Sequence, residues 1–273
     1  MENQKTAWHD LCCYMMEVHN HRYREALEQE YKACIDEGLI WTDSELAKYM
    51  NSCPNPEFQS FLEETYQKYK QSPSYVSDEE MFMADEEKIN NFLDKKQSEF
   101  NSRDIVYKNR ANDVAYKAEL RVALADYHKW QNRASDPNYN FGYTGVGSFE
   151  PKRTELSDDQ IAWNDLKNMM MVSVNPRYLQ FLTEVLKRIR KNGLIKNENG
   201  EDVSMASEEE FNRALSQTPL TYQDIMFALR CEDFEYLKEV KEAYADIVAW
   251  SKRINDVTFG TQISTASGPT MQG

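Results

Sequence analysis

Residues 7–40 read AWHDLCCYMMEVHNHRYREALEQEYKACIDEGLI, and residues 162–195 read AWNDLKNMMMVSVNPRYLQFLTEVLKRIRKNGLI. The two stretches align without a gap at a shift of 155 positions, and 14 of the 34 aligned residues are identical. Average residue usage would leave about two identities by chance. The chain is therefore predicted to contain a tandem duplication.

The repeated stretch has the pattern of two consecutive helices. Trp8, Leu11 and Met15 recur at steps of three and four residues, which places them on one apolar helix face. Asn20 then stands where a helix N-cap belongs, and Gly38 follows the second helix at the position that favours a left-handed backbone. The second copy has Asn175 and Gly193 at the equivalent positions, so a helical hairpin is predicted twice.

The rest of the chain also favours helices. Only 9 glycines and 8 prolines occur in 273 residues, and the hydrophobic content of 41% suffices for a core. Residues 86–133 contain neither glycine nor proline, which predicts one very long helix or two nearly continuous ones in the first copy. The predicted fold is all-α, a tandem duplication of a four-to-five-helix module.

A closing motif, Ala-Asp-x-x-x-Trp-x-x-Arg, occurs at residues 125–133 and again at 245–253. It sets the domain prediction: module 1 at 1–134, with an insert at about 70–112, and module 2 at 157–255. Residues 135–156 and 256–273 are rich in Gly, Ser, Thr and Asn. These two segments are predicted to be an extended linker and an extended C-terminal tail.

The net charge of −14 is spread over both halves of the chain, which disfavours binding to nucleic-acid phosphates or to anionic membranes. Two interpretations remain: a solvated acidic surface, or a surface that docks on a basic protein. No stretch has the character of a secretory signal or a membrane span. Five cysteines, an odd number, favour reduced thiols and a cytoplasmic location, or a virion if the protein is viral.

His9, Cys12 and Cys13 lie close enough along a helix to suggest a metal site. Adjacent cysteines point about 100° apart on a helix, however, and the second copy has neither histidine nor cysteine at these positions. Whether these residues bind a metal is left open, and no metal or cofactor is predicted. No Glu-x-x-His or phosphate-loop motif occurs either. The chain is predicted not to be an enzyme, with a site between the modules as the alternative.

Polar residues shared by the two copies are candidate bridges between helices. An aspartate on the first helix of each hairpin could pair with an arginine on the second through a charge-assisted hydrogen bond. Binding of the same ligand by both copies is the other explanation. The candidate bridging residues are Asp10, Arg22, Asp165, Arg177, Asp126 and Asp246.

The function predicted from the sequence is a non-enzymatic structural, assembly or adaptor protein of a large complex, of which a phage virion connector or internal component is one form. It would bind protein partners through its linker and its C-terminal tail. The acidic run at 77–87 could dock on a basic groove, but the favoured interpretation is that it begins the long helix and buries its phenylalanine on the bundle. The alternative is an acidic regulator that occupies a basic nucleic-acid-binding surface of another protein. The candidate partner-binding residues are Phe141, Tyr143, Phe259, Ile263, Met81 and Phe82.

Overall fold

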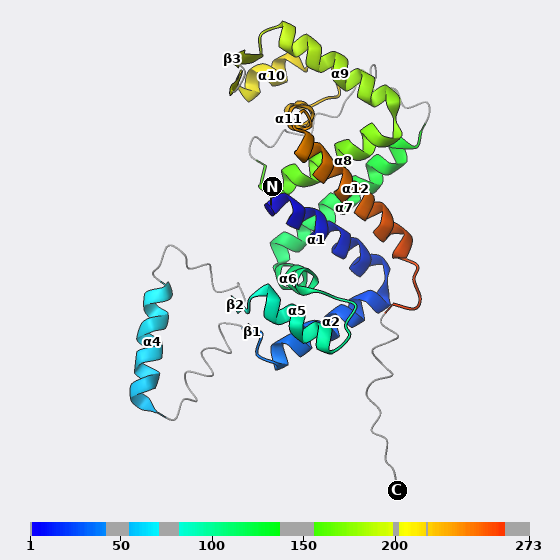
Figure 1. Cartoon of the computed structure of the whole chain (residues 1–273). Helices are drawn as coiled ribbons and strands as arrows, with labels where there is room; N and C mark the ends of the chain where they lie inside the picture. Colours follow the sequence, from blue (N-terminus) through cyan, green and yellow to red (C-terminus); the bar gives the residue numbers. More distant parts are fainter. Residues whose placement is uncertain are drawn as a thin grey trace. The chain divides into compact units, whose positions relative to one another are not determined.

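A computed structural model describes residues 2–41, 55–70, 82–136, 156–198, 202–216 and 218–259 (Figure 1). These residues form helices almost throughout, which confirms the predicted all-α class. The helices are α1 (Glu2–His19), α2 (His21–Asp36), α4 (Pro56–Lys70), α5 (Glu86–Lys95), α6 (Ser102–Arg110), α7 (Val114–Ala134), α8 (Asp158–Val174), α9 (Pro176–Lys191), α10 (Glu208–Ala214), α11 (Tyr222–Arg230) and α12 (Phe234–Arg253). The strands are β1 (Ile40–Trp41), β2 (Phe82–Met83), β3 (Ile195–Glu198) and β4 (Asp202–Met205).

The chain divides into two compact units. The first unit combines Met1–Met15 with Glu119–Arg253, and the second combines Met16–Ala118 with Ile254–Gly273. Helices α1 and α7 therefore contribute residues to both units. The module boundaries predicted from the repeat do not coincide with this division and stay a prediction.

Both repeated stretches form two consecutive helices, as predicted. The Asn20 side chain accepts hydrogen bonds from the backbone amides of residues 22 and 23 and so begins α2, and Asn175 begins α9 in the same way. Gly38 and Gly193 follow these helices with φ of 72° and 71°, a conformation that a Cβ atom would strain. Local side-chain and backbone preferences therefore set both ends of the second helix of each hairpin, α2 and α9.

The elements that follow come in the same order in residues 2–136, the first half, and in residues 156–259, the second half. Strand β1 pairs with β2 through Ile40 and Met83, and β3 pairs with β4 through Ile195 and Met205. Helices α5, α6 and α7 then correspond to α10, α11 and α12. By this correspondence the extra residues of the first half lie at 42–81, between β1 and β2, and include α4. The insert predicted at about 70–112 stays a prediction, as do the module boundaries.

The sequence predicts one very long helix or two nearly continuous ones over residues 86–133. The stretch instead forms three helices, so the prediction of one very long helix is wrong. Gln97 has a left-handed φ of 54° just after α5. Asn101 and Asp104 form a reciprocal capping box at the start of α6, and Asp113 accepts backbone hydrogen bonds at the start of α7. Polar side chains that bind the backbone can end and restart a helix without glycine or proline.

In the first unit, two repeated tryptophans exchange hydrogen bonds. Trp8 Nε1 on α1 donates to the Ala162 carbonyl at 2.7 Å, and Trp163 Nε1 on α8 donates to the Ala7 carbonyl at 3.0 Å. Both indoles are buried. A contact in which residue i meets j and j meets i is isologous, the geometry of a two-fold dimer, here formed within one chain.

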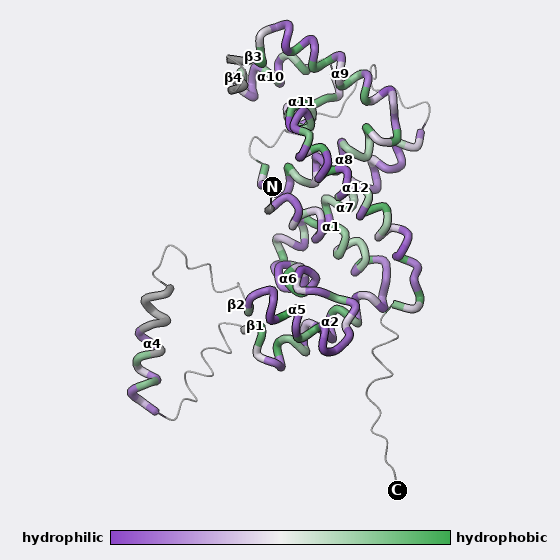
Figure 2. The backbone as a smooth tube through the Cα atoms, viewed as in Figure 1, coloured by the Kyte–Doolittle hydropathy of each residue, from purple (hydrophilic) through white to green (hydrophobic). Residues whose placement is uncertain are grey.

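Hydrophobic and hydrophilic residues alternate along the helices, as expected of elements with one buried face (Figure 2). The fully buried side chains of the second unit include Tyr23, Ile89 and Tyr107, and those of the first include Phe211 and Phe227. Among the described helices, none combines the length and the apolarity that crossing a bilayer requires.

Candidate functional site

A buried carboxylate links three helices of the first unit. Asp165 on α8 is fully buried and accepts hydrogen bonds from Arg230 on α11, at 2.7 Å from Nε and 2.5 Å from Nη2. The Tyr236 hydroxyl on α12 donates to the same carboxylate. Asp165 is thus an inter-helix bridge, but its partner is Arg230 and not the predicted Arg177, which is exposed in the first turn of α9.

Burial and the partners of Asp165 have opposite effects on the pKa of its carboxyl group, which is raised overall. Burial raises the pKa of Asp165, and the hydrogen bonds and charge of Arg230 act in the opposite direction. Burial, together with the Asp165 charge, also raises the pKa of the Tyr236 phenol. The phenol therefore stays protonated and keeps donating. Since both carboxylate oxygens accept hydrogen bonds, the arrangement is suited to bridging helices.

A second polar cluster lies in the same unit. Tyr178 on α9 donates to Asn168 Oδ1 at 2.6 Å, and Asn168 Nδ2 donates to Asp224 Oδ1 at 2.9 Å. Asp224 Oδ2 accepts from the Thr221 backbone amide at 2.7 Å, which closes the capping box of α11. Burial raises the pKa of Tyr178 well above its usual value. This chain of bonds ties α8, α9 and α11 together.

The second unit contains a network of charges around Glu17, which is only 6% exposed. Glu17 accepts hydrogen bonds from Tyr107 at 2.5 Å and from Lys117 at 3.2 Å. Lys108 Nζ lies 3.9 Å from Glu17 and 2.9 Å from Glu28. Burial alone would raise the pKa of Glu17, but the Tyr107 hydrogen bond and the two lysine charges lower it.

The other predicted bridging residues differ in their surroundings. Asp10 is fully buried, whereas the Arg22 side chain is exposed next to the Asn20 cap. Asp126 and Asp246 are exposed and form no ion pair with any residue in the described parts of the chain. The predicted bridging role of Asp10 and Arg22 stays a prediction.

Sequence reasoning missed the two partners of Asp165. A signal was present, because Arg230 and Tyr236 stand 120 positions after Arg110 and Tyr116, the same shift that relates the two closing motifs. Extending the alignment back from those motifs would have identified an Asp–Arg–Tyr set in each half. The hairpin alignment alone drew attention to Arg177 instead.

Of the predicted partner-binding residues, Phe141, Tyr143, Ile263 and Met81 lie outside the described residues. Phe82 belongs to β2, where its backbone pairs with Trp41. Phe259 is 4% exposed, and its ring centroid lies 5.2 Å from that of Tyr23 and 5.5 Å from that of Phe100. The Phe259 ring is therefore part of the core of the second unit and presents almost no surface to a partner.

His9, Cys12 and Cys13, the residues on α1 considered as metal ligands, are only partly accessible. His9 Nε2 lies 3.3 Å from Cys13 Sγ, and both Cys12 and Cys13 are buried. Burial raises the pKa of the Cys12 thiol, and the negative charges of Asp246 and Asp10 raise it further. A thiol that keeps its proton is a weak nucleophile, so Cys12 is not suited to covalent chemistry.

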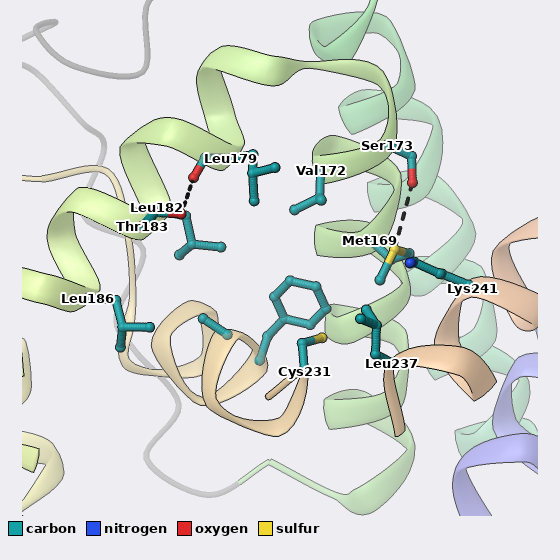
Figure 3. Close-up of a pocket in the computed structure, with 12 residues that line it drawn as sticks. Met169, Val172, Ser173, Leu179, Leu182, Thr183, Leu186, Cys231, Leu237 and Lys241 are labelled. Carbon is teal, nitrogen blue, oxygen red and sulfur yellow. Dashed lines mark hydrogen bonds between the residues drawn. The ribbon is translucent and has the colours of Figure 1, made fainter. Parts of the chain in front are cut away.

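A cavity of about 450 Å³ lies among α8, α9, α11 and α12 of the first unit (Figure 3). Nine of its twelve lining residues are apolar, and the others are Ser173, Thr183 and Lys241. Both hydroxyls are engaged locally: Thr183 donates to the Leu179 carbonyl at 2.7 Å, and Ser173 lies 3.7 Å from Met169 Sδ. Lys241 is exposed at the edge of the cavity. The cavity is therefore an apolar recess with one cationic side chain.

No protein-family model, curated protein or solved structure shows significant similarity to this chain. Its chemistry is accordingly inferred from its own side chains. Where the chain is described, the buried clusters around Asp165, Asn168 and Glu17 all connect helices.

Proposed function

We propose that this chain is a non-enzymatic structural protein, an assembly or adaptor component that holds protein partners in a larger complex. The supporting observation is that buried carboxylates of the chain bond to side chains of other helices. Catalysis needs a nucleophile, acid or base that can reach a substrate. The carboxylate of Asp165 instead accepts hydrogen bonds from two other helices. Glu17 accepts hydrogen bonds from Tyr107 and Lys117 and forms an ion pair with Lys108.

The proposal includes an origin by tandem duplication. It is supported by 14 identities in 34 aligned residues, by the common order of elements in the two halves, and by equivalent glycines with left-handed φ. The exchange of hydrogen bonds between Trp8 and Trp163 adds a contact of the kind that two identical subunits would make. A duplicated scaffold can present two similar surfaces to a symmetric partner.

Docking through the linker at 135–156 and the tail at 256–273 remains part of the proposal, with Phe141, Tyr143 and Ile263 as contact residues. Phe259 takes a different role, since its ring packs in the second unit. Asn20 Nδ2 also donates to the Asp256 carbonyl at 3.2 Å. These contacts hold the first residues of the tail against the second unit.

The test compares the full chain with a chain that ends at residue 260, each expressed with an affinity tag in the native source. The full chain is expected to sediment with a large particle in constant stoichiometry. The shortened chain, whose far-UV circular dichroism should be unchanged because Phe259 is kept, is expected to sediment as free protein. Equal incorporation of both chains would exclude docking through the tail. Sedimentation of the full chain as free protein would exclude the assembly function itself.

A further inference from the structure

Three residues that line the cavity of the first unit are equivalent in sequence to charged residues in the first half of the chain. The shift of 155 relates Glu17 to Val172, and the shift of 120 relates Lys108 to Ala228 and Lys117 to Leu237. Glu17, Lys108 and Lys117 belong to the charged network of the second unit. In the second half all three are apolar, and all three line the cavity.

Two further pairs of equivalent residues are also less polar or uncharged in the second half. Tyr107, whose hydroxyl donates to Glu17, corresponds to Phe227, and Glu28 corresponds to Thr183. A recess of about 450 Å³ thus lies at this place in both halves. In the first half it is lined by charged and polar residues, among them Glu17, Glu28 and Lys108. In the second half its walls are mostly apolar. The two halves therefore differ in the chemistry of the recess, which is charged in the first half and apolar in the second. Its volume falls in the range of small-molecule pockets, about 300–1,000 Å³.

The side chains that line the cavity restrict the chemistry of a ligand. A sugar or nucleotide would bury many polar groups against apolar walls, where they would lack hydrogen-bond partners. Ser173 and Thr183 add little, because their hydroxyls are engaged within their own helices. An apolar molecule with a single polar group is the class that fits.

The polar group of such a ligand should be negative. Lys241 lines the cavity and forms no ion pair with another residue that the structure describes. Helix α9, which supplies another wall, carries five basic residues and one acidic residue in a chain of net charge −14. Lys241 is the one charged residue among the twelve that line the cavity.

We propose that this cavity binds a fatty-acid-type ligand, a single aliphatic chain that ends in a carboxylate. The alkyl chain lies against Leu182, Phe227 and Leu237, and the carboxylate pairs with the Lys241 ammonium at the solvent edge. This inference is independent of the proposed assembly function, because none of the residues on which that function rests lines the cavity.

The test is isothermal titration calorimetry of the full chain with sodium decanoate below its micelle concentration, and with decanol in parallel. Decanoate is expected to bind saturably at one site. Decanol is expected to bind about two- to fivefold more weakly, the range that a solvent-exposed ion pair contributes. Absence of saturable binding of decanoate would overturn the proposal.

Two variants test whether the charge of Lys241, and not that of a neighbouring lysine, binds the carboxylate of decanoate. Lys241→Met keeps the apolar stem and is expected to reduce decanoate affinity to that of decanol, while decanol affinity stays unchanged. Lys238→Met removes the same charge from the same helix at a position that does not line the cavity, and should leave both affinities unchanged. Equal losses in the two variants would mean nonspecific attraction and would overturn the carboxylate site.

Two further variants occupy the cavity. Ala228→Leu fills part of it and is expected to weaken decanoate binding by about fivefold or more, because the larger side chain takes volume that the alkyl chain would occupy. Leu179→Trp acts at the rim, where Leu179 is 46% exposed, so it blocks entry even if the first variant does not fold. Undiminished binding by a folded form of either variant would contradict the assignment of this cavity.

Discussion

Replacing Asp165 by Asn is expected to destabilise the first unit strongly. The amide keeps the size of the carboxylate but loses its charge and one of its acceptor oxygens. Arg230, which donates to Asp165 at 2.7 and 2.5 Å, would then be a largely buried cation without a counter-charge. Tyr236 would lose its acceptor or compete with Arg230 for a single oxygen.

The magnitude follows from the burial of the two partners. Removing one member of a buried ion pair typically costs about 3–5 kcal/mol. The Asp165 side chain is fully buried, but the Arg230 side chain is 22% exposed and can regain some hydration. We therefore expect a loss of about 3 kcal/mol, which lowers the melting temperature of a unit of this size by roughly 6–12 °C.

Urea unfolding followed by tryptophan fluorescence is a suitable assay, because four of the five tryptophans belong to the first unit: Trp8, Trp130, Trp163 and Trp250. Asp246→Asn is the matched control, since it removes the same charge from an exposed position on α12 and should change the free energy of unfolding by less than about 0.5 kcal/mol.

The double variant Asp165→Asn/Arg230→Met should be more stable than Asp165→Asn alone, because no unpaired guanidinium remains. Equal free energies of unfolding for Asp165→Asn and Asp246→Asn would refute the bridge as a source of stability.

Three other changes test the remaining contacts. Trp163→Phe removes the donor to the Ala7 carbonyl and should cost about 1–3 kcal/mol in thermal unfolding followed by circular dichroism; a cost equal to that of an exposed-site variant would contradict this. Gly193→Ala places a Cβ at φ of 71° and should cost about 1–2 kcal/mol, measured by urea unfolding. The pKa of Glu17 is lowered from its usual value of 4.5, so its ionised form stabilises the second unit above that pH, and this contribution is lost as pH falls through the lowered pKa. Glu17→Gln should therefore reduce the acid sensitivity of the urea midpoint between about pH 6 and about pH 3, whereas the exposed Glu37→Gln should not.

Much of the local structure could be predicted from the sequence, because it depends on neighbouring residues. Asn20 and Asn175 begin α2 and α9 by binding amides two and three positions ahead, and Ser157 begins α8 with a capping box. The same kind of signal was overlooked at Asn101 and Asp113. There the absence of glycine and proline suggested continuity, although capping side chains compete effectively with the helix.

The partner of a buried charge depends on which helices the fold brings together. Arg177 and Asp165 lie on neighbouring helices of one hairpin, yet the carboxylate meets Arg230, 65 positions away. Periodicity locates a side chain on a helix face but does not say which other helix covers that face. The cavity has the same character, since its apolar walls read in the sequence as ordinary core positions.

The sequence by itself determined the helical class, the repeated hairpin and the ends of its helices, because these follow from periodicity and capping within a few residues. Only the tertiary structure decided that Asp165 bridges to Arg230 and Tyr236, that Phe259 is buried, and that the positions equivalent to Glu17 and Lys108 surround a cavity. Each of these depends on contacts between residues far apart in the chain, where shape and charge must match across several helices at once.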